Sequence, residues 1–146
     1  MDFKFNITIS INIILKKLIF LSIIASQLAL NSCNENPYKQ GKLYYTSACA
    51  NCHMENGEGL RGLIPPLAKA DYLSKSRGDI PCSIRKGLKG KIIVNGVEYG
   101  QQEMLAISKL SEFEIANILN YIGTSWGNNE KLWTADEVRA GLDKCP

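Results

Sequence analysis

Residues 47–57 read SACANCHMENG, a stretch that holds two cysteines, a histidine and a methionine within six positions, from Cys49 to Met54. The flanking pattern is helical, and residues three apart in a helix lie about one turn apart on the same face. We therefore expect Cys49 and Cys52 to sit about a helical turn apart, with His53 directly after them. This arrangement is half of a binding site, and the other half has to come from elsewhere in the chain.

The spacing Cys-x-x-Cys-His over residues 49–53 is the attachment pattern of c-type haem. Two thiols a helical turn apart can add across the two vinyl groups of one porphyrin, and the following imidazole can then bind the iron. Two alternatives stay open. A four-cysteine zinc site would add Cys82 and Cys145 to the motif pair, although these two show no tight spacing. A redox-active cysteine pair would need a βαβ setting, whereas the surrounding pattern is helical.

The second axial ligand of such an iron has to be a different residue type, because His53 is the only histidine in the chain. The three methionines are Met1, Met54 and Met104. Met1 lies in the leader, and Met54, next to His53, would stay on the proximal side of the ring. Met104 precedes the next predicted helix by seven residues and is the predicted sixth ligand. The alternative is a core methionine, which would leave one iron position open.

The N-terminal segment has the composition of a targeting signal. Lys16 and Lys17 precede LIFLSIIASQLAL, residues 18–30, which is uncharged and too short to span a membrane as a stable helix. The whole chain of 146 residues is long enough for one domain and a leader. From residue 33 onward, 14 lysines and arginines face 13 aspartates and glutamates, so the basic footprint of a nucleic-acid-binding protein is missing.

Residues 30–33 read LNSC and resemble the lipobox of bacterial lipoproteins, in which the cysteine is lipidated and becomes the first mature residue. The resemblance implies a lipoprotein-type signal peptide over residues 1–32, a lipid anchor at Cys33 and a polar tether over residues 33–37. The domain would then cover residues 38–146 in an exported, oxidising compartment, either the periplasm or an outer membrane face. The alternative is an ordinary cleaved signal that leaves Cys33 as a spare thiol.

The chain before and after the motif alternates helices and loops. Gly41, Tyr45 and Ala48 share one face of a predicted helix that leads into the motif, and a glycine at this place indicates close packing against another helix. Residues 55–66, with three glycines and two prolines, form a loop. The Asn-Gly pair at 95–96 between β-branched residues predicts a small β-hairpin. Short helices are predicted over residues 67–76 and 81–88.

Two capping boxes mark the beginning of the last two helices. Ser111 with Glu114 opens a long helix, and Thr134 with Glu137 opens a short one. The long helix carries an apolar stripe, typical of a helix packed on a core, made of Ile115, Ile118, Leu119 and Ile122.

With these elements placed, the sequence resembles class I cytochromes c over roughly residues 38–128. Four features of that family occur in order. A glycine and an aromatic residue, Gly41 and Tyr45, lead into the haem motif; a Pro-Pro-Leu triplet at 65–67 follows it; Met104 comes next; and the helix after Ser111 closes the match.

The resemblance implies an all-α, small cytochrome c fold with three to five helices around one covalently bound haem, to which the predicted hairpin adds a short β element. It implies that Gly41 and Tyr45 pack near Ile118 and Tyr121. It also implies that the carbonyl of a proline, assigned here to Pro65, accepts a hydrogen bond from the axial histidine. The chain from about residue 129 onward extends beyond the usual end of the family fold. The expected cofactor is one haem c with its iron, and the expected binding residues are Cys49, Cys52, His53, Met104 and Pro65.

Two cysteines are left once Cys33 is assigned to lipid and the motif pair to haem. These are Cys82 and Cys145, and two leftover thiols in an exported protein favour pairing. We expect a disulfide between them that pins the last helix; two buried free cysteines are the alternative.

The expected function is one-electron transfer rather than catalysis. Methionine sulfur favours ferrous iron, and a six-coordinate haem leaves no position for oxygen chemistry. We expect a membrane-tethered carrier that exchanges electrons with a redox protein donor and acceptor, such as an oxidase, a dehydrogenase or a reductase. The alternatives are a dedicated cytochrome subunit of a periplasmic oxidoreductase complex and a peroxidase- or sensor-type haem protein with an open iron position.

Overall fold

The structure is a computed structural model that describes residues 15–22 and 36–145. The chain divides into two units, Met1–Glu35 and Asn36–Pro146. In the first unit, residues 15–22 form a helix, and the rest of the expected signal peptide, together with Cys33, lies outside the described residues. Over the described ranges, every helix is too short or too polar to cross a membrane.

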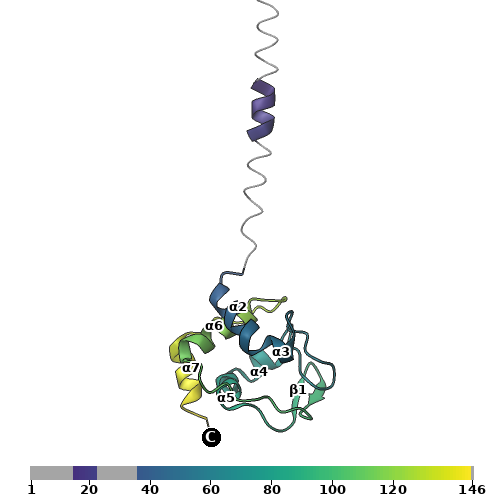
Figure 1. Cartoon of the computed structure of the whole chain (residues 1–146), viewed down its shortest axis with the longest axis vertical. Coiled ribbons are helices and arrows are strands. Elements are labelled where there is room, and N and C mark those ends of the chain that lie inside the picture. The colour runs from purple at the N-terminus through teal and green to yellow at the C-terminus, as the bar shows by residue number, and fades with distance from the viewer. Residues whose placement is uncertain (1–14, 23–35, 146) are drawn as a thin grey trace, which may run out of the picture. The chain divides into compact units, whose positions relative to one another are not determined.

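The second unit is mostly helical, with one small hairpin (Figure 1). Its elements are α2 (Lys39–Ala48), α3 (Ala50–His53), α4 (Tyr72–Lys75), the 3₁₀ helix η2 (Arg77–Asp79), α5 (Ile80–Lys86), β1 (Ile92–Val94), β2 (Val97–Tyr99), α6 (Glu112–Gly123) and α7 (Ala135–Leu142). Among these described elements, α2, α5, α6 and α7 have between 7 and 12 residues, so four helices of more than one turn match the expected three to five. The additional segments α3, α4 and η2 are single turns.

Helix α2 crosses α6 at close range because Gly41 has no side chain. A Cβ atom at Gly41 would collide with the backbone carbonyl of Asn117 and lie 2.9 Å from Cβ of Tyr121. One turn later, the ring of Tyr45 lies 5.5 Å from that of Tyr121 and 5.1 Å from that of Trp126. Such tilted aromatic pairs stabilise a core beyond the area they bury. The expected packing of Gly41 and Tyr45 beside Tyr121 is confirmed.

Helix α6 begins where its sequence predicts. The Ser111 hydroxyl accepts a hydrogen bond from the Glu114 amide, and the Glu114 carboxylate accepts one from the Ser111 amide, so the capping box is confirmed. The helix ends at Gly123. Its apolar stripe lies in the core and consists of Ile115, Ile118, Leu119 and Ile122, each less than 5% exposed.

The hairpin forms at the predicted Asn-Gly turn. Val94 pairs with Val97 across a two-residue turn in which both Asn95 and Gly96 have positive φ. Asp71, just before α4, fixes the tip, since its amide donates to Asn95 Oδ1 at 3.0 Å and its carboxylate accepts from the Asn95 amide at 2.7 Å. This double contact holds the buried side chain of Val94 against the core.

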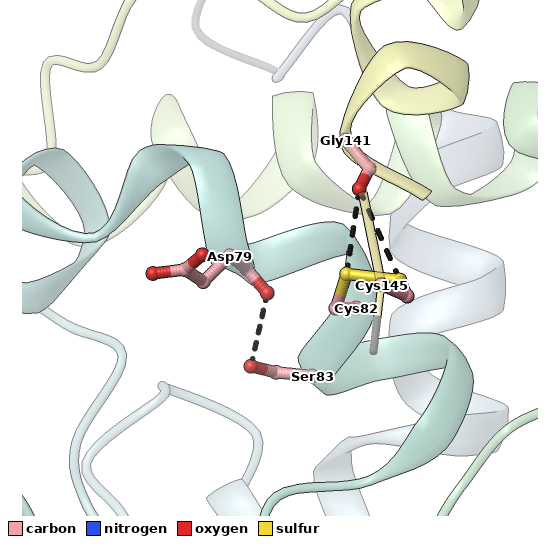
Figure 2. Close-up of a disulfide and its surroundings, with 5 residues drawn as sticks. All are labelled: Asp79, Cys82, Ser83, Gly141 and Cys145. Carbon is pink, nitrogen blue, oxygen red and sulfur yellow. Dashed lines mark hydrogen bonds between the residues drawn. A yellow bond between two sulfur atoms is a disulfide. The ribbon is translucent and has the colours of Figure 1, made fainter. Parts of the chain in front are cut away.

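The C-terminal segment returns to the domain through α7, which opens with the predicted capping box at Thr134 and packs on α5 and α6. A disulfide joins Cys82 of α5 to Cys145 just after α7, with 5.7 Å between their Cα atoms (Figure 2). Gly141 favours this close approach, because a Cβ atom there would lie 3.0 Å from the Pro81 ring. The carbonyl oxygen of Gly141 lies 3.4 Å from Cys82 Sγ. The last helix is therefore bonded covalently to α5.

Candidate functional site

An apolar cavity of about 660 Å³, counting its open mouth, lies between the helices and the hairpin. Side chains from α3, α4, α5, β1 and α6 and from the intervening loops line it, and they are mainly aliphatic. Among the lining residues, Cys49, His53 and Met104 carry sulfur or nitrogen atoms that can bond to a porphyrin or its iron.

The two cysteines of the motif lie at the junction of α2 and α3. Cys49 lines the cavity and is 8% exposed, whereas Cys52 lies on the exposed side of α3, and neither takes part in a disulfide. The amide of His53 donates to the carbonyl of Cys49 at 2.9 Å, so one helical turn separates the ends of the motif. Burial, followed by repulsion from Cys52, raises the pKa of the Cys49 thiol to about 11. Cys49 is therefore a neutral thiol at pH 7.

His53 is held in the tautomer that a metal ligand requires. Its Nδ1 lies 3.0 Å from the carbonyl oxygen of Pro65. Because a carbonyl can only accept, Nδ1 is the protonated nitrogen, and Nε2 retains its lone pair. Burial lowers the pKa of His53, and the bond to Pro65 opposes this shift only in part. The imidazole is thus neutral and its Nε2 is available to a metal.

A glycine that the sequence analysis does not single out makes the contact between His53 and Pro65 possible. Gly59 donates its amide to the His53 carbonyl at 3.1 Å. Its φ is +65°, and a Cβ atom there would lie 2.7 Å from the Pro65 carbonyl oxygen. The loop over residues 55–66 can therefore fold back onto His53 only with glycine at this position. The glycine-rich composition of the loop was the available signal, but it does not indicate which glycine approaches the histidine.

Met104 reaches the same cavity as His53 from the other half of the chain. It pairs with Leu88 in an isolated antiparallel bridge, where both backbone hydrogen bonds measure 3.0 Å. Met54 does not belong to the described lining of the cavity. Its φ is 64°, and its carbonyl accepts a hydrogen bond from the Tyr45 hydroxyl at 2.6 Å. Of these two methionines, Met104 therefore shares the cavity with His53.

Of the remaining predicted residues, Pro65 belongs to the cavity and the cysteine pair does not. Pro65 lines it, but Cys82 and Cys145 are bonded to each other and so cannot complete a four-cysteine zinc site. Within residues 15–22 and 36–145, no cluster of three or more histidine, cysteine or acidic side chains has the geometry of a metal site. The cavity holds the Cys49 thiol, the His53 imidazole and the Met104 thioether in apolar surroundings, and the Cys52 thiol lies on the exposed side of α3. These four donors fit a covalently attached haem.

Comparison with known proteins agrees with this donor set. The family model described as cytochrome c matches residues 38–126. Two proteins named cytochrome c-552, one from Thermus thermophilus and one from a particular strain of the same species, are each 38% identical to this chain over 107 residues. The alignments cover 67% of this chain in both cases, and 79% and 70% of the respective relatives.

Proposed function

Because the chain belongs to the cytochrome c family, we propose that it carries single electrons through one haem whose iron is held by His53 and Met104. Proteins of this family bind haem c covalently and transfer electrons through its iron, and their function requires redox partners. The observation that supports the assignment of ligands is that His53 and Met104, 51 positions apart, line one apolar cavity.

Each residue of the site has a definite part in this proposal. Cys49 and Cys52 supply the two sulfur atoms for the thioether bonds. His53 supplies Nε2 while Pro65 keeps the proton on Nδ1, since the two atoms are 3.0 Å apart. When bound, haem c supplies an iron that alternates between the ferrous and ferric states. Met104 supplies a soft, neutral sulfur, which favours the ferrous state and raises the reduction potential.

The aliphatic walls of the cavity keep water away from the metal. Low polarity around the site disfavours the additional charge of the ferric state, and it limits the rearrangement of solvent when an electron arrives. With His53 and Met104 both holding the iron, no coordination position would remain for oxygen or peroxide. This is why we propose a carrier rather than a peroxidase or a gas sensor.

The methionine variants test the proposal. Met104→Ala should lose the weak absorption band near the red end of the visible spectrum that marks sulfur bound to ferric haem. Its midpoint potential should fall, and its reduced form should bind carbon monoxide rapidly. Met54→Ala is the matched control and should leave all three properties unchanged. A pyridine haemochrome spectrum confirms that each variant still contains haem c. An unaltered spectrum and potential in Met104→Ala would contradict the proposed ligand.

We also propose that the carrier is exported and anchored to a membrane by lipid on Cys33, in the periplasm or on an outer membrane face. The support is the uncharged stretch over residues 18–30 and the LNSC sequence that ends at Cys33. The tether would raise the effective concentration of the carrier near membrane-bound donors and acceptors.

The tether can be removed without changing the domain. Cys33→Ala in the full chain should move the protein from the membrane fraction to the soluble fraction, and the haem spectrum should stay the same. Oxidation of the reduced variant by membranes of the source organism should be slower than that of the wild type at equal haem content. A variant that stays in the membrane fraction would disprove anchoring by Cys33.

A further inference from the structure

The segment over residues 104–110, which begins with Met104 and which we call the ligand segment, lies along the end of α5. Its first residue is bonded to Leu88 by two backbone hydrogen bonds of 3.0 Å. In its middle, the amide of Ile107 donates to the carbonyl of Ile84 at 2.9 Å. The backbone of α5 and of the residue shortly after it thus holds the segment at two places.

The end of the ligand segment is held by a side chain. Arg85 Nη2 donates to the carbonyl oxygen of Leu110 at 2.7 Å, and the same nitrogen lies 3.6 Å from a carboxylate oxygen of Glu112 at the beginning of α6. The guanidinium therefore links α5 to the end of the segment and to the helix that follows. A hydrogen bond from a charged donor is stronger than one between neutral groups, and the planar group of arginine is suited to two acceptors at once.

The fit between α5 and the ligand segment leaves no room for adjustment. Gly87, which ends α5, has a φ of +82°. A Cβ atom at Gly87 would lie 2.5 Å from the Met104 carbonyl oxygen and 3.0 Å from the Ala106 amide. The segment therefore lies directly against the end of α5 and cannot move closer to it.

The contacts of Arg85 are made by one end of its guanidinium group. Its Nε is buried and has no hydrogen-bond partner in the described part of the chain. A buried donor without a partner destabilises the folded state. The residue is better explained by what its Nη2 does at Leu110.

We propose that Arg85 is a positioning residue for the sixth ligand: by holding Leu110, it keeps the ligand segment on α5 and Met104 at the iron. The inference rests on the proposed function, in which Met104 is that ligand. No proline occurs within residues 104–110 to stiffen the segment, so its position depends on these bonds to α5. Loss of the Arg85 bond should loosen the end of the segment, so that Met104 leaves the iron more often, while the bonds to Leu88 and Ile84 keep the domain folded.

Competition by free imidazole measures this directly. Imidazole added to the ferric holoprotein can replace Met104 only when the segment moves away, and the sulfur-to-iron band reports the exchange. For Arg85→Ala, which loses a charge-assisted hydrogen bond, we expect an apparent imidazole affinity about tenfold higher than that of the wild type. Arg85→Lys keeps the charge but not the planar group. Its apparent imidazole affinity should lie between those of the wild type and Arg85→Ala.

Arg77 provides the matched control. Its guanidinium also donates to backbone carbonyls, those of Lys131 and Leu132, at 2.8 and 3.0 Å, but these lie in the C-terminal extension. Arg77→Ala should lower the urea midpoint followed by far-UV circular dichroism and leave the imidazole affinity unchanged. Equal effects of Arg77→Ala and Arg85→Ala on imidazole binding, or no effect of Arg85→Ala, would overturn the proposal.

The same titrations separate this inference from the proposed function. If the wild type lacks the sulfur-to-iron band, or binds imidazole as tightly as Met104→Ala, then Met104 is not the ligand and the proposed function fails. If the wild type and Met104→Ala differ as expected but Arg85→Ala behaves as the wild type, then only the role of Arg85 is wrong. Should Arg85→Ala not fold, Arg85→Lys still gives the answer.

Discussion

Single residues decide how the two ends of the proposed haem site meet. The proton on Nδ1 of His53 follows from one carbonyl, that of Pro65, 3.0 Å away. That carbonyl in turn reaches the histidine because Gly59 has no side chain in its way. The first residue of the motif, Cys49, is buried, and burial raises the pKa of its thiol. Before haem attachment, this thiol therefore stays protonated at pH 7. At this scale, the chemistry depends on contacts that one additional methyl group would disturb.

The role of Gly59 can be tested against a second glycine of the same loop. Gly59 and Gly62 both have positive φ, but a Cβ atom at Gly62 would have no neighbour within 4 Å. Gly62→Ala should therefore suffer only from backbone strain, about 1–2 kcal/mol. Gly59→Ala adds a steric collision with Pro65 and should lower the free energy of unfolding by about 1–3 kcal/mol more. Urea unfolding of the two holoproteins gives both values. Equal losses of unfolding free energy in the two variants would show that the loop around Gly59 can move to make room for a Cβ atom.

Among the elements, α6 is the one with the most local determinants. A capping box fixes where it begins, and an apolar stripe fixes which face it turns to the core. The Glu114 carboxylate accepts from the amide and the hydroxyl of Ser111 at 2.7 and 2.8 Å. The hydrogen bond from the Ser111 backbone amide is the main reason that the pKa of Glu114 lies below the ordinary 4.5 of a glutamate.

This lowered pKa predicts a dependence of stability on pH. Because the folded state alone lowers the pKa of Glu114, the ionised group stabilises the fold above pH 4.5, and this contribution disappears as the pH falls through the lower folded value. Glu114→Gln cannot ionise. Its free energy of unfolding should therefore fall less than that of the wild type between about pH 7 and about pH 3. Urea unfolding followed by circular dichroism measures the difference. Parallel curves for the two proteins would contradict the prediction.

The whole domain is closed by a segment that lies outside the match to the cytochrome c family. That match ends at residue 126, whereas α7 and Cys145 lie beyond it. Arg77 binds this extension, with its guanidinium 3.7 Å from the centre of the Trp133 ring, and the disulfide joins it to α5 (Figure 2). The extension is therefore attached to α5 and supports the fold of the domain.

Removal of the disulfide tests this support. The two cysteines are 63 positions apart, and a crosslink over such a loop stabilises the folded state by about 4 kcal/mol, chiefly by restricting the unfolded chain. Cys82→Ala/Cys145→Ala should lose about this amount in urea unfolding and retain its haem spectrum in water. A thiol reagent offers the control: the denatured wild type should take up two additional labels after reduction, and the variant none. Equal stability of the two proteins would argue against a role for the bridge.

The sequence alone determined the features that depend on close neighbours along the chain. The haem motif, the two capping boxes and the Asn-Gly hairpin are all set by spacings of a few residues, because one turn of helix or one tight turn satisfies them. Counting was sufficient where a residue type is rare, as for the single histidine and the leftover cysteine pair.

Only the tertiary structure decided which distant groups meet. It placed Gly59 beneath the carbonyl of Pro65, the ligand segment on the end of α5, and the guanidinium of Arg85 on Leu110. No local pattern indicates these contacts, since glycines and arginines are common on any surface. They arise when loops far apart in the chain close over the same cavity, and the geometry of that closure depends on the packing of all the helices at once.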